Sequence, residues 1–127
     1  MRIVDRATFM ALPAGTLFAE GEPWAFEPMR FKYETLPSND WVELDPCGVA
    51  ASSSMTANDY MEDMLVNGSS YPMEDSCGRN GLFHEKAVFL VFERADLLKL
   101  RDMIDEAITV AQDEQKAPPP EGSGASS

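Results

Sequence analysis

Apolar and polar residues alternate most cleanly over residues 29–34. The apolar members are Met29, Phe31 and Tyr33, and the polar members are Arg30, Lys32 and Glu34. Successive side chains of a β-strand point to opposite faces, so the segment predicts a half-buried strand. We expect its apolar side to face the core.

Residues 37–40 carry a turn signal, and residues 41–44 then predict an antiparallel partner strand. Val42 and Leu44 would share the core face. Arg30 and Lys32 would lie on the outer face, paired across the hairpin with Glu43 or Asp45. Further short strands are predicted at residues 1–4 and 16–18.

Residues 87–92 form an unbroken apolar run, which is typical of a central strand buried on both faces. Residues 69–85 are polar and predict a loop, with a tight turn at Asn80 and Gly81. A brief helix is expected to begin after Asp5 and to end near Leu12, before Pro13.

A second helix is predicted over residues 57–67, with hydroxyl caps in residues 52–56 and a C-terminal glycine at Gly68. Its spacing places four apolar side chains on one face and three carboxylates in solvent. The apolar set is Tyr60, Met61, Met64 and Leu65, and the acidic set is Asp59, Glu62 and Asp63.

The final helix is predicted over residues 95–112. Its apolar stripe consists of Leu97, Leu100, Ile104, Ala107, Ile108 and Ala111. The elements together predict an α+β fold, in which a small antiparallel or mixed sheet packs against this amphipathic helix, with one or two shorter helices. Residues 1–112 would form a single domain, and the Pro-, Gly- and Ser-rich residues 113–127 a disordered tail. The second sheet face would need the shorter helices, the loop or a second subunit, so a homodimer is one expectation.

Charge narrows the classes of partner. The 127 residues carry a net charge of −12, which repels nucleic-acid phosphates and anionic lipid, so neither is an expected direct partner. The longest apolar run is far below the roughly 20 residues that span a bilayer. With two cysteines and no signal-peptide pattern at residues 1–5, the sequence favours a cytoplasmic protein with reduced thiols.

The residues that could support chemistry are Cys47, Cys77 and His84, with Asp75 nearby. They could in principle form a thiol–imidazole pair or a zinc site, but their spacing matches no usual ligand pattern. With 22 carboxylates in the chain, acid–base pairs carry no signal. We therefore predict no cofactor, no metal and no enzymatic activity, and keep a small enzyme or metal protein as the alternative.

Acidic residues concentrate in residues 41–85, which hold eight carboxylates against Arg79 and so carry −7 of the net −12. Such a surface can fit a basic groove on a partner, or it can serve solubility alone. The candidate partner-binding residues are Asp59, Glu62, Asp63, Glu74 and Asp75.

A resemblance adds a context. Residues 3–18 read IVDRATFMALPAGTLF, residues 89–96 read FLVFERAD and residues 100–102 read LRD. These stretches resemble short uncharacterised proteins encoded by bacteriophages and prophages. The resemblance implies an accessory protein that inhibits or modulates a host protein, and it assigns no site residue.

The sequence thus predicts a small acidic protein-binding module, directed at a host protein with a basic surface. A structural component that works as a homo-oligomer is a further alternative.

Overall fold

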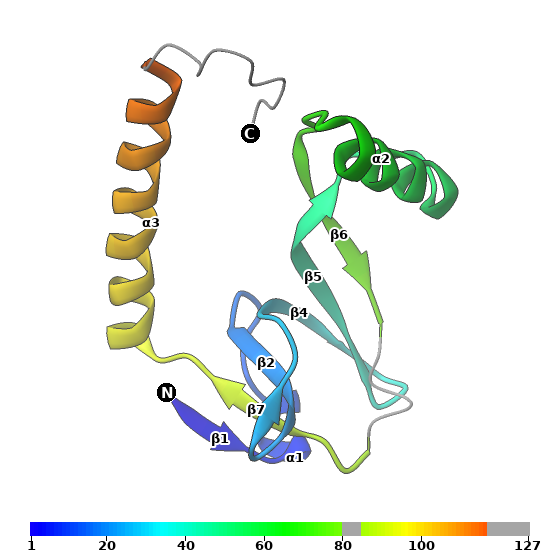
Figure 1. Cartoon of the computed structure of the whole chain (residues 1–127). Helices are drawn as coiled ribbons and strands as arrows, with labels where there is room; N and C mark the ends of the chain where they lie inside the picture. The colour runs from blue at the N-terminus through cyan, green and yellow to red at the C-terminus, as the bar shows by residue number, and fades with distance from the viewer. Residues whose placement is uncertain (80–84, 117–127) are drawn as a thin grey trace. The chain divides into compact units, whose positions relative to one another are not determined.

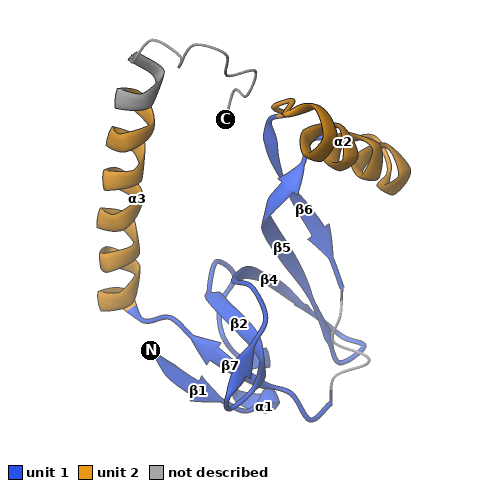
Figure 2. Ribbon diagram, in the orientation of Figure 1, with its two compact units in different colours: residues 1–50, 72–93 blue, residues 51–71, 94–127 orange. Residues whose placement is uncertain are grey.

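The computed structural model describes the backbone of residues 1–79 and 85–116, and the side chains of residues 1–79 and 85–112. The chain divides into two units, shown in different colours in Figure 2. Unit 1 comprises Met1–Ala50 and Pro72–Glu93, and holds every strand of the described chain. Unit 2 comprises Ala51–Tyr71 and Arg94–Ser127, and contains two long helices. The predicted α+β class is confirmed.

Unit 1 is built on one antiparallel sheet (Figure 1). Its strands are β1 (Arg2–Val4), β2 (Leu17–Glu22), β3 (Ala25–Phe26), β4 (Arg30–Leu36), β5 (Asp40–Val49), β6 (Met73–Gly78) and β7 (Val88–Val91). Their order is β1-β7-β2-β4-β5-β6, and β3 pairs with β2. The predicted hairpin is confirmed as β4 and β5, with Phe31 opposite Leu44 and Lys32 opposite Glu43.

The core of unit 1 is aromatic and centres on a residue of α1 (Arg6–Met10). The Asp5 side chain accepts a hydrogen bond from the Thr8 amide at 2.8 Å and so caps this helix, as predicted. Phe9 is fully buried on the sheet. Its ring centroid lies 4.6, 5.0 and 4.0 Å from those of Phe18, Trp41 and Phe89.

The face of the β4–β5 hairpin that turns toward the core is the opposite of the predicted one. Lys32 and Glu43 are each only 1% exposed, whereas Met29 and Tyr33 are exposed. Val42 and Leu44, expected in the core, are half-buried. The reason is Trp41: its ring belongs to the aromatic core, and residues two apart on a strand share a face, so Glu43 points inward with it.

Lys32 tolerates burial because its ammonium group is well supplied with acceptors. Nζ donates to the Leu12 carbonyl and to Thr35 Oγ1, both at 2.8 Å, and to the Tyr33 carbonyl at 3.2 Å. Burial nevertheless lowers the pKa of Lys32, because desolvation disfavours the charged form. The interior of the hairpin is therefore partly polar.

Two further predictions for unit 1 need correction. β7 lies between β1 and β2 with Phe89 and Val91 buried and Val88 and Leu90 half-buried, so only one face of this strand is fully buried. The predicted loop contains β6, whose side chains are all exposed and which is held by backbone pairing with β5. Residues 80 and 81, the predicted tight turn, lie outside the described residues.

Unit 2 contains α2 (Ser54–Asn67) and α3 (Arg94–Lys116). Ser53 caps α2, and Gly68 ends it in the left-handed conformation with φ 69°, which confirms the predicted C-terminal glycine. Asp59 and Glu62 are exposed, as predicted, but no α2 side chain is buried: on the predicted apolar face Tyr60 and Met64 are half-buried, and Met61 is 50% and Leu65 86% exposed. Amphipathic spacing predicts which side of a helix is apolar, and it does not predict what covers that side.

α3 confirms the predicted C-terminal helix and continues past the expected end at Gln112. Its apolar stripe was expected in the core, yet Leu97, Ile104 and Ile108 are 40%, 58% and 50% exposed. The remainder of the predicted tail, residues 117–127, lies outside the described residues. Within the described part of the chain, no helix combines the length and the apolar character needed to cross a membrane.

Candidate protein-binding surface

The acidic residues of α2 share their side of the helix with exposed apolar residues. Met55, Asp59, Glu62 and Val66 follow one another at spacings of three and four residues, which places them along one side, and Leu65 lies next to Glu62 and Val66. Met55 is 75%, Leu65 86% and Val66 69% exposed, and both carboxylate residues are exposed as well. We call these five residues the α2 surface.

The α2 surface borders a small open depression of about 250 Å³. It is lined by Asp59, Glu62, Asp63, Val66 and Asn67, all from α2. Because a single helix supplies the whole lining, the depression does not enclose a small molecule as an enzyme cleft does.

Asp63 is already bonded within unit 2. Its carboxylate accepts hydrogen bonds from Tyr71 Oη at 2.6 Å and from Asn67 Nδ2 at 2.7 Å. Hydrogen bonds from Tyr71, Asn67 and Ser69 lower the pKa of Asp63, and the Asp63 carboxylate in turn raises the pKa of Tyr71. Asp63 therefore positions the segment that follows α2, where Tyr71 also stacks on Tyr60 with centroids 4.3 Å apart.

The other two candidate residues, Glu74 and Asp75, lie on β6 in unit 1 and are exposed. As neighbours along a strand they point to opposite faces of the sheet. The structure thus brings Asp59, Glu62 and Asp63 together on one helix and holds Glu74 and Asp75 on a separate element. Of the five acidic residues predicted to form one binding surface, only the three on α2 are shown to lie close to one another.

Unit 1 contains a group of buried charges that the sequence does not predict as buried. They are Glu20, Lys32, Asp40 and Glu43, each no more than 4% exposed. Arg30 Nη1 lies 3.2 Å from Glu43 Oε2, which confirms the predicted cross-strand pairing of Arg30, although Glu43 is buried instead of lying on the outer face. The predicted pairing of Lys32 with Glu43 or Asp45 is wrong, because its ammonium group donates to Leu12, Tyr33 and Thr35. Arg79 Nε lies 3.1 Å from Asp40 Oδ2. Burial raises the pKa of Glu43; Arg30 opposes that rise, while Glu20 and Glu27 add to it.

These buried charges connect neighbouring segments of unit 1. Each acts on a neighbour within the sheet or its flanking segments, as Arg30 on β4 does with Glu43 on β5. Trp41 is the sequence signal that could have revealed the buried Glu43. A large aromatic side chain tends to face the core, and residues two apart on a strand share a face.

The residues considered for metal or thiol chemistry are placed only in part. Cys47 on β5 and Cys77 on β6 are exposed free thiols. His84 lies outside the described residues. Among the residues that are described, no group of three or more His, Cys, Asp or Glu side chains is arranged to hold a metal ion.

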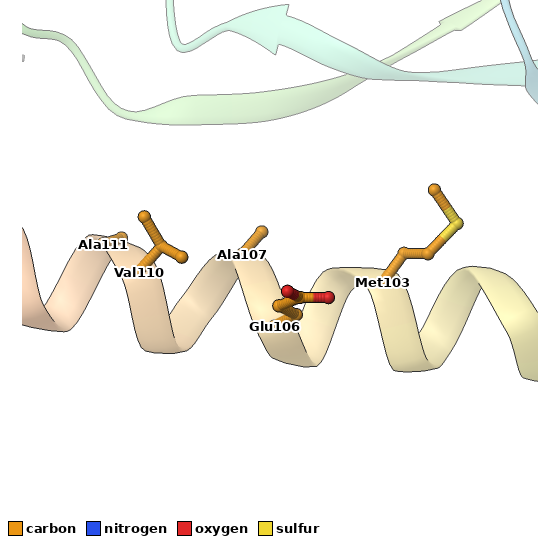
Figure 3. Close-up of a pocket in the computed structure, with 5 residues that line it drawn as sticks. All are labelled: Met103, Glu106, Ala107, Val110 and Ala111. Carbon is orange, nitrogen blue, oxygen red and sulfur yellow. The ribbon is translucent and has the colours of Figure 1, made fainter.

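A second open depression, of about 430 Å³, lies on α3. Figure 3 shows Met103, Ala107, Val110 and Ala111 projecting from the same side of the helix, with Glu106 beside them. Ala107 and Ala111 belong to the apolar stripe that the sequence predicts for this helix, whereas Met103 and Val110 do not. Like the α2 depression it is lined by one helix and does not form an enclosed ligand site.

Comparison of the chain with family models, with curated proteins and with solved structures finds no match.

Proposed function

We propose that this chain is a small acidic protein-binding module, and that its α2 surface docks on a basic surface of another protein. The observation that carries the proposal is the mixture of side chains on α2. Asp59 and Glu62 lie between Met55 and Val66 along one side of the helix, and Leu65 is the most exposed of the large apolar residues described.

This mixture favours binding over a purely solubilising role. A solubilising helix needs charge and gains nothing from exposing methionine, leucine and valine to water. Protein interfaces, by contrast, combine apolar anchors at the centre with charged residues that steer the encounter and select the partner. Methionine suits such a surface, because its flexible thioether adapts to the shape of the partner.

The charge of the chain favours a basic protein as the partner. The carboxylates of Asp59 and Glu62 would meet lysine or arginine side chains, while the net charge of −12 opposes phosphate backbones. The resemblance to phage and prophage accessory proteins suggests that the partner is a host protein that the module inhibits or modulates.

The test is capture of partners from bacterial lysate on the immobilised full chain, quantified by mass spectrometry. Wild type is compared with Glu62→Lys and Leu65→Asp, each verified as folded by circular dichroism. The matched control is Glu121→Lys, which changes the net charge as much as Glu62→Lys does, at a position distant from α2 in the sequence.

A captured protein that is retained by wild type and by the control, and reduced at least about tenfold by both α2 variants, supports the proposal. Recovery of the same proteins at equal yield by all four chains would show that α2 is not the binding surface.

A further inference from the structure

The apolar residues of α3 follow the spacing of a helix that pairs with another helix. Leu97, Leu100, Ile104, Ala107 and Ala111 recur at alternating intervals of three and four residues. This alternation keeps one seam of a helix against a partner helix and is the pattern of a coiled coil. Leu97 and Ile104 are 40% and 58% exposed, so the seam presents accessible apolar surface.

The seam is wide enough for close packing. Met103 and Val110, 56% and 55% exposed, extend it on one side, and Ile108, 50% exposed, extends it on the other. The small side chains of Ala107 and Ala111 let a second backbone approach closely; both point to the same side as Met103 in Figure 3.

The charges of α3 select the direction of that partner. Residues 94–101 contain Arg94, Lys99 and Arg101 against Asp96, a net charge of +2. Residues 102–112 contain Asp102, Asp105 and Glu106 and no basic residue, a net charge of −3. The helix is therefore basic in its first half and acidic in its second half.

We propose that a second copy of this chain covers the seam, with the two α3 helices antiparallel and crossing near Ile104. In this arrangement the basic half of each helix lies beside the acidic half of the other. A parallel pair would place like charges together. Each α3 helix carries both the basic half and the acidic half. A second α3 helix can therefore match its charges even though the chain as a whole is negative.

Self-association is tested on the full chain by light scattering and sedimentation at about 100 μM. We expect the mass of a dimer for wild type, of a monomer for Ile104→Asp, and again of a dimer for the control Thr109→Asp. Thr109 lies on the opposite side of α3 and is exposed. A monomeric wild type, or an Ile104→Asp variant that keeps the dimer mass, would overturn the proposal.

The direction of pairing is tested by disulfide cross-linking in a background with Cys47→Ser and Cys77→Ser. Leu97→Cys and Ala111→Cys chains are mixed and oxidised; the two positions are 14 residues apart, or about 21 Å along the helix. An antiparallel pair gives mainly the disulfide between position 97 of one chain and position 111 of the other, with little 97–97 or 111–111 disulfide. Predominant 97–97 and 111–111 products, or no cross-link at all, would refute the antiparallel pair even if Ile104→Asp fails to fold.

Discussion

The Arg30–Glu43 pair predicts that removing the cation will harm the fold more than removing the carboxylate. Glu43 is 1% exposed, and apart from the ion pair neither of its oxygens has a hydrogen-bond partner among the described residues. Glu20 and Glu27 add repulsion, so the ionised carboxylate depends on Arg30. Arg30 is 26% exposed and can be hydrated without its partner.

Breaking a buried pair by removing one partner costs about 3–5 kcal/mol when the remaining charge stays buried. For Arg30→Ala we expect about 3 kcal/mol, the lower end, because the exposed part of Arg30 is screened by solvent. For Glu43→Gln we expect a change within about 1 kcal/mol, because a neutral amide removes the desolvation of a buried charge.

The dependence on pH has a definite sign. The pKa of Glu43 is raised in the fold from its ordinary value of 4.5. Its protonated form therefore favours folding below pH 4.5, and this contribution is lost as pH rises through the folded-state pKa. The cost of Arg30→Ala should accordingly shrink as pH falls from 7 toward 4.5.

Urea unfolding followed by tryptophan fluorescence measures these differences. Trp41 is fully buried and reports unfolding, while Trp24 is 80% exposed in the folded chain and contributes a nearly constant background. An Arg30→Ala variant as stable as wild type, with Glu43→Gln losing several kcal/mol, would refute this reasoning.

Three further predictions concern the core and the segment after α2. Phe9→Ala should lower the free energy of unfolding by about 3–5 kcal/mol, because it empties the centre of the aromatic core; a loss below about 1 kcal/mol in urea unfolding would contradict the packing. Lys32→Met should cost about 1–3 kcal/mol, since the carbonyl and hydroxyl groups that Lys32 binds lose their donor; an unchanged thermal midpoint would contradict this. Tyr71→Phe should raise the pKa of Asp63 toward its ordinary value, as measured by NMR titration, and no shift would show that the Tyr71 hydrogen bond does not hold this carboxylate.

Local patterns predicted the elements of unit 1 better than their orientation. The alternation over residues 29–34 shows that the two faces of β4 differ, and it leaves open which face turns inward. The pairing of Lys32 with tertiary acceptors, including the distant Leu12 carbonyl, makes the charged face acceptable to the core. Such acceptors come from other parts of the chain and leave no trace in the local pattern.

β6 was missed because its sequence, MEDSCG, contains few residues that favour strands. It becomes a strand through backbone hydrogen bonds to β5, a tertiary effect that local propensity does not report. For the candidate site, the sequence predicted the acidic side of α2, including Asp59 and Glu62. It did not predict that Leu65 is exposed, because helical spacing identifies an apolar face and does not report what covers it.

The most direct test of the proposed function is the salt dependence of the complex between this chain and the protein that it captures. Surface charges interact over about 10 Å at 0.1 M salt and about 3 Å at 1 M salt. We expect association to slow at least about tenfold over this range for wild type, and the defect of Glu62→Lys to be largest at low salt and to fade at high salt. Equal association rates at both salt concentrations, or a Glu62→Lys defect that is the same in both, would show that the acidic residues of α2 do not recognise the partner.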